Sequence, residues 1–92
     1  MSNVAIEYYE KKFGDDVTKA FVHLVREVGE IALAVERNNI DLAKMEITES
    51  VALLQFMAKK YGFDLQSNID TVYTKKLQTL QKSSLNIWSI AN

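Results

Sequence analysis

Residues 21–37 (FVHLVREVGEIALAVER) and 40–60 (IDLAKMEITESVALLQFMAKK) decide the fold, because only Asn38 and Asn39 separate two long helical patterns. In the first stretch, apolar side chains recur every three or four residues, which is typical of one helix face. They are Phe21, Leu24, Val25, Val28, Ile31, Ala32 and Val35. Helices joined by so short a connection are antiparallel neighbours. The sequence therefore predicts a central helical hairpin.

Two further helices are expected, one on each side of the hairpin. The first covers about residues 3–13 and ends at Gly14, and the last covers about residues 65–81. Gly62 is expected to end the third helix. Asp15 or Asp16 is expected to cap the second helix, and Asp41 to lie at or near the start of the third. Residues 83–92 are expected to form a tail.

The composition predicts one all-α domain over residues 1–92, with a core of about 18–80. The chain has no proline and three glycines, which suits long helices. A 92-residue chain buries a modest share of its surface, yet 48% of these residues are hydrophobic. Association with further copies would hide the surplus. We therefore expect a four-helix chain that oligomerisation completes into a helical bundle.

Charge and composition exclude several classes of function. A net charge of −1 lacks the basic footprint of a protein that binds nucleic acid polymers. Without cysteine, neither disulfides nor zinc–thiolate sites can form. No signal peptide is recognisable, and no apolar run reaches the roughly 18 residues of a membrane span. These observations predict a cytoplasmic protein with no membrane contact.

Glutamates on the two central helices are the candidate site. At about 100° per residue, Glu46 and Glu49 fall on the apolar side of their helix. Glu27 and Glu30 lie one turn apart on a polar strip that also holds His23. Burying an ionised carboxylate without a partner is very costly, so the acidic pair on the apolar side needs an explanation.

A four-carboxylate cluster of this kind repels itself unless cations bind it. Mg²⁺ prefers oxygen ligands and keeps waters that phosphate oxygens can replace; Mn²⁺ is a second candidate. Other interpretations stay open. Glu27 and Glu30 can belong to a solvated face, and Glu46 and Glu49 can pair with another subunit. His23 can touch metal or substrate, although a polar or interface histidine is the commoner case.

Three segments together resemble a known family. They are residues 24–32 (LVREVGEIA) with E-x-x-E, residues 46–49 (EITE), and residues 61–65 (YGFDL). The pattern is similar to the MazG-like nucleoside triphosphate pyrophosphohydrolases over roughly residues 18–80. The resemblance implies an all-α fold, dimers or dimers of dimers, and Mg²⁺-dependent hydrolysis. The substrate would be a nucleoside triphosphate, cleaved to the monophosphate and pyrophosphate, with cleaning of the nucleotide pool as the role.

The resemblance also implies roles for particular residues. The metal ligands would be Glu27, Glu30, Glu46 and Glu49. Glu27 or Glu30 would orient or deprotonate the attacking water, and Lys76 would meet substrate phosphate. This chain departs from the family pattern at Glu49, where aspartate is usual. It also departs at Arg26, where many members have glutamate, and at Leu80, where asparagine is frequent.

Two other functions fit the same sequence. One is a phosphoribosyl-ATP pyrophosphohydrolase, which shares this architecture. The other is a non-catalytic helical oligomer that binds nucleotide or a protein partner, which the three departures favour. Turnover of phosphoribosyl-ATP alone would indicate the former, and metal binding without turnover the latter.

Overall fold

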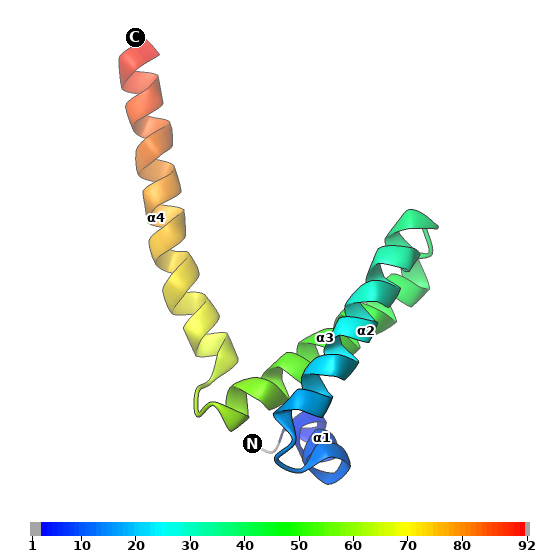
Figure 1. Cartoon of the computed structure of the whole chain (residues 1–92). Helices are drawn as coiled ribbons and strands as arrows, with labels where there is room; N and C mark the ends of the chain where they lie inside the picture. Colours follow the sequence, from blue (N-terminus) through cyan, green and yellow to red (C-terminus); the bar gives the residue numbers. More distant parts are fainter. Residues whose placement is uncertain (1–2, 92) are drawn as a thin grey trace.

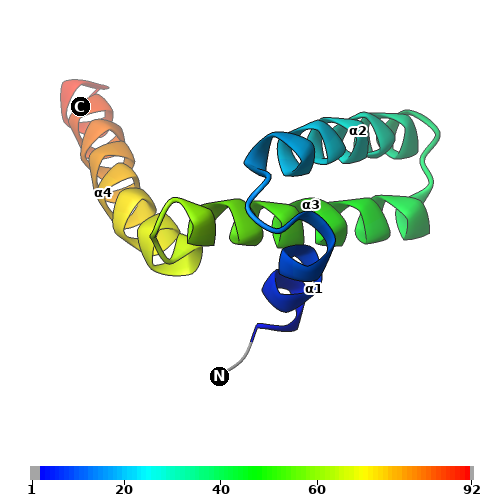
Figure 2. The ribbon, with the colours of Figure 1, turned by 60° about the horizontal axis from the view of Figure 1, so that its bottom comes forward.

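The computed structural model describes the backbone of residues 3–91 and the side chains of residues 3–83, and every regular element in it is an α-helix. The elements are α1 (Val4–Phe13), α2 (Val17–Glu36), α3 (Ile40–Lys60) and α4 (Leu65–Ala91). α2 and α3 lie side by side and antiparallel, α1 packs mainly on α3, and α4 projects away from the end of α3 (Figures 1 and 2). The predicted all-α class with four helices is confirmed.

The helix ends follow from local side-chain chemistry. Asp16 caps α2 by accepting a hydrogen bond of 3.0 Å from the backbone N–H of Lys19. Asn39 caps α3 in the same way, and Asp41 lies in its first turn. After α3, Gly62 adopts φ +78°, a left-handed conformation that favours glycine and ends the helix.

The end of α4 differs from the sequence prediction. A helix end near residue 81 and a tail over residues 83–92 were expected, but α4 continues to Ala91. The prediction was wrong because this stretch holds neither glycine nor proline, so nothing in it breaks the helix.

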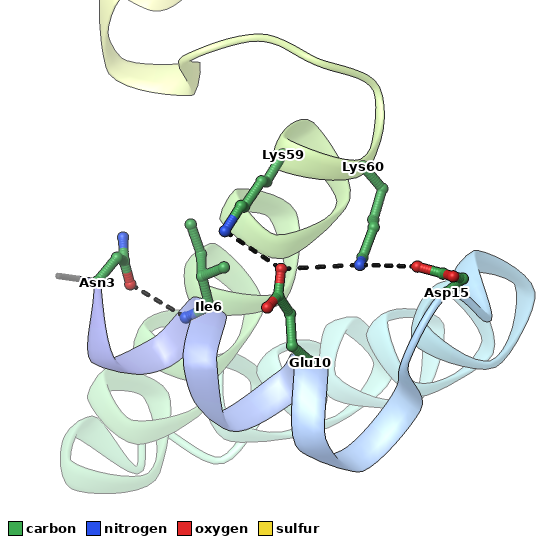
Figure 3. Close-up of polar contacts among 6 residues, drawn as sticks. All are labelled: Asn3, Ile6, Glu10, Asp15, Lys59 and Lys60. Carbon is green, nitrogen blue, oxygen red and sulfur yellow. Dashed lines mark hydrogen bonds and ion pairs between the residues drawn. The ribbon is translucent and has the colours of Figure 1, made fainter.

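The hydrophobic core lies where α1 crosses the α2–α3 pair. Leu53 and Phe56 of α3 and Ala20 of α2 have no exposed surface, and Tyr9 of α1 packs against them. Figure 3 shows how ion pairs close the edge of this contact. Glu10 lies 3.2 Å from Lys59 and 3.7 Å from Lys60, and Lys60 also lies 3.0 Å from Asp15.

The opposite side of the hairpin is apolar and uncovered. Four of the exposed apolar side chains of α2 form one strip with spacings of three, four or seven residues, and they are Phe21, Val25, Val28 and Val35. A matching strip on α3 consists of Ile40, Ile47, Val51 and Leu54. Each strip lies roughly 110° around its helix from a buried glutamate, which is Glu27 on α2 and Glu46 on α3. Because the helices are antiparallel, the two strips share one side of the pair.

The single chain is extended. Its radius of gyration is 17.9 Å, whereas a compact domain of this length has one of about 12 Å. It exposes 7376 Å², whereas a monomer of 10.5 kDa exposes about 5,400 Å². α4 accounts for much of this shape, because the part of it whose side chains the structure describes packs against α3 and no other helix. Among the described residues, no helix combines the length and apolar character needed to cross a membrane.

Candidate metal centre

Three glutamates from the two central helices converge inside the hairpin. Glu27 of α2 and Glu46 and Glu49 of α3 each offer a carboxylate oxygen, and these oxygens lie within 4.8 Å of one another. Glu27 and Glu46 are both only 8% exposed, and Glu49 is half-buried. We call this group the carboxylate trio. The fold thus brings together three of the four predicted metal ligands, and the two most distant of them, Glu27 and Glu49, are 22 positions apart in the sequence.

One oxygen of the trio has no partner. Oε2 of Glu46 is buried and accepts no hydrogen bond. The nearby hydroxyl of Ser50 does not serve it, because this group donates to the backbone carbonyl of Glu46 at 2.8 Å. Buried polar oxygens are nearly always paired, and an unpaired one costs free energy. The arrangement therefore leaves an acceptor that a cation, or a proton on a neighbouring carboxyl group, would satisfy.

The electrostatics of the trio fit the same interpretation. A hydrogen bond with the carboxyl group of Glu46, burial, and the nearby carboxyl group of Glu49 raise the pKa of Glu27 to about 8. Adjacent like charges and low solvation both favour the protonated acid. Without a cation, Glu27 therefore keeps a proton at neutral pH, and a bound divalent cation would replace that proton.

Two further residues lie beside the trio: His23, for which contact with metal or substrate was one of the alternatives from the sequence, and Tyr9 of α1. Nε2 of His23 lies 3.1 Å from Oε1 of Glu27. Tyr9 is close enough that burial first, and then the charge of Glu49, raise the pKa of its phenol. The spacing of four residues between His23 and Glu27 is a signal that sequence reasoning can use. Tyr9 had no such signal, because helix packing alone brings it there.

Glu30 and Lys76 lie outside the trio. Glu30 is half-buried one turn further along α2, roughly 60° around the helix from Glu27. Its carboxylate oxygens are not among those that converge in the trio. Lys76 is exposed in the middle of α4, where its Nζ lies 5.2 Å from the ring centre of Tyr73. Among the described residues α4 has no contact with α2, and it projects away from α3 (Figure 1), so a single chain does not bring this lysine to the carboxylates.

The residues present fit a hard divalent cation. The donor set is made of carboxylate oxygens, which Mg²⁺ and Mn²⁺ accept, and it lacks the thiolates that softer metals select. Searches of protein families, curated proteins and solved structures find no match to this chain. The interpretation of the site therefore rests on its own chemistry and on the sequence pattern.

Proposed function

We propose that this chain is a subunit of a homo-oligomeric, Mg²⁺-dependent nucleoside triphosphate pyrophosphohydrolase. It would convert a (d)NTP and water into the (d)NMP and pyrophosphate, in the cytoplasm and as part of nucleotide-pool cleaning. The observation that carries the proposal is the buried carboxylate trio with its unpaired Glu46 oxygen. The resemblance to MazG-like enzymes supplies the reaction type.

Glu27, Glu46 and Glu49 would hold the cation, with Mn²⁺ as a possible substitute for Mg²⁺. The trio supplies few ligands, which leaves coordination positions for water and for substrate phosphate, as Mg²⁺ sites in phosphoryl-transfer enzymes do. A bound Mg²⁺ would neutralise phosphate charge and lower the pKa of a bound water molecule. Glu30 joins this set only if its side chain turns toward Glu27, which a half-buried helix residue can do.

The chain's own groups have two further tasks in the proposed reaction. One glutamate must orient or deprotonate the attacking water, and Glu27 is the first candidate because it belongs to the trio that would hold the cation and its bound water. Glu30, one turn away, is the second. A cation must also balance the phosphate charge, which is the role we propose for Lys76.

Oligomerisation follows from the uncovered apolar strips of α2 and α3. Their exposed side chains recur at the spacing that packs helices in bundles, so two hairpins facing each other would form a four-helix bundle. The chain exposes about 1,900 Å² more than a compact monomer of its mass. An obligate dimer buries an area of this order on each subunit. In such an assembly, α4 of one copy would bring Lys76 to the trio of another.

The test is pyrophosphate release from a panel of canonical and modified (d)NTPs, with Mg²⁺ and with EDTA. Wild-type protein should release pyrophosphate and the nucleoside monophosphate in equal amounts, only with the metal. Glu46→Gln should abolish release, whereas Glu36→Gln changes an exposed glutamate on α2 and should leave it unchanged. Equal turnover by wild type and Glu46→Gln would contradict the proposal.

A non-catalytic nucleotide-binding oligomer is the second candidate. Three features favour this function: Arg26, Leu80 and the position of Glu30 outside the trio. At each of them the chain lacks a group that the MazG-like enzymes have at the site. Metal and nucleotide binding without any product would support this function. The same panel should include phosphoribosyl-ATP. Turnover of this compound alone would indicate a phosphoribosyl-ATP pyrophosphohydrolase instead of either function above.

A further inference from the structure

His23 precedes Glu27 by one turn of α2. We propose that His23 is a positioning residue, whose Nε2–H donates to Oε1 of Glu27 and so fixes the orientation of that carboxyl group beside Glu46 and Glu49. The two atoms lie 3.1 Å apart, and the side chains are 23% and 10% exposed. The inference rests on the proposed function, because it concerns how the carboxylate trio is made ready for a cation.

The imidazole itself is held by aromatic packing from α1. The ring of Phe13 meets that of His23 edge-on, with 5.9 Å between centroids and 60° between planes. Phe13 in turn stacks on Tyr9 at 5.7 Å, and Tyr9 belongs to the hydrophobic core. Aromatic contacts of this geometry are favourable and directional. α1 thereby fixes the imidazole, and the imidazole fixes Glu27.

Glu27 is the trio member that most needs such a partner. Glu46 and Glu49 come from one helix, so their spacing is set by that helix alone, whereas Glu27 must be aimed across the hairpin from α2. A neighbour that binds one carboxylate oxygen restricts rotation of the whole group. Groups that orient metal ligands in this way commonly contribute about tenfold or more to metal affinity.

The test compares three variants of the full chain by calorimetric titration with MgCl₂. His23→Leu keeps bulk against Phe13 but removes the donor, and its Kd should be weaker by about tenfold or more. His23→Gln restores an N–H donor at a similar reach and should recover most of the affinity. Lys19→Leu makes a similar change one turn earlier on the exposed side of α2 and should bind as wild type does.

The enzyme assay supplies a second readout. In His23→Leu, the Mg²⁺ concentration for half-maximal activity should rise, while kcat at saturating Mg²⁺ should stay close to the wild-type value. Two results would overturn the inference: a Kd for Mg²⁺ in His23→Leu equal to that of the wild type, or an equal loss of Mg²⁺ affinity in His23→Leu and His23→Gln. Failure of the wild-type chain to bind Mg²⁺ would instead overturn the proposed function along with it.

Spectroscopy separates positioning from direct ligation. The sequence contains a single histidine, so the imidazole nitrogen signals of ¹⁵N-labelled protein need no further assignment. They should show a proton on Nε2 in metal-free protein. A bare Nε2, or ¹⁴N coupling from the imidazole in the electron spin resonance of bound Mn²⁺, would overturn the positioning role.

Discussion

Glu27 of α2 and Glu46 of α3 bring their carboxyl groups together in a region where each residue is only 8% exposed. Two ionised carboxylates this close in a buried site repel each other strongly. Metal-free protein avoids the repulsion by keeping a proton on Glu27, whose pKa rises to about 8. In the metal centre that we propose, a cation would take the place of this proton.

The stability of metal-free protein should therefore depend on pH through Glu27. Its pKa is raised from 4.5 to about 8 on folding, so the folded chain holds a proton that the unfolded chain has released. The associated stability is fully present below about pH 4.5 and is lost as the pH rises to about 8, with a slope of up to about 1.4 kcal/mol per pH unit.

Urea unfolding in EDTA across this range measures the effect, with Glu27→Gln as the comparison. The glutamine variant lacks the titrating group, so the difference between the two proteins should change with pH. If the wild type and Glu27→Gln follow the same pH dependence, the proton is not on Glu27.

Mg²⁺ affinity should rise with pH for the same reason. Below the pKa of Glu27 the cation must displace the proton, so Kd should fall by up to about tenfold per pH unit and level off near pH 8. Calorimetry in two buffers with different ionisation enthalpies counts the protons released. A pH-independent Kd with no proton release would show that the trio is already ionised.

Glu46→Gln should stabilise metal-free protein while it removes metal binding. The substitution replaces a charged, unpaired oxygen with a neutral amide that can donate to a neighbouring carboxylate. We expect the free energy of unfolding in EDTA to rise by about 1–2 kcal/mol, as measured by urea titration. A destabilised variant would show that this carboxylate supports the fold by itself.

A charge on the uncovered face should dissociate the oligomer. Val28→Glu places a carboxylate within the α2 strip, and burying it against a second copy would be very costly. Sedimentation should show the monomer at concentrations where the wild type is oligomeric. Thr48→Glu changes an exposed residue of α3 outside the apolar strip and should leave the mass unchanged. Oligomers of unchanged mass for Val28→Glu would place the interface elsewhere.

Much of the local structure could be predicted from the sequence. Caps and stops are set by single residues such as Asp16 and Gly62, so the helix order and the first three helices were expected. The approach of Glu46 and Glu49 to a shared buried space also follows from their place on an apolar face. The far end of α4 was predicted wrongly. Residues 82–91 contain neither glycine nor proline, so the helix continues to Ala91.

The rest depends on packing between elements. The rotation of α2 against α3 decides that Glu27 and not Glu30 joins the trio, and small differences in interhelical contacts set that rotation. The contacts of α1 bring Tyr9 and Phe13 to the site. The direction of α4, and hence the place of Lys76, depends on the short connection between Lys60 and Leu65.

The most direct test of the account is Mn²⁺ binding followed by electron spin resonance, with wild-type protein, Glu46→Gln and Glu36→Gln side by side. Wild type and Glu36→Gln should each bind Mn²⁺ in competition with Mg²⁺, and Glu46→Gln should bind none at the same concentrations. Equal binding by all three proteins would contradict a metal centre at Glu27, Glu46 and Glu49.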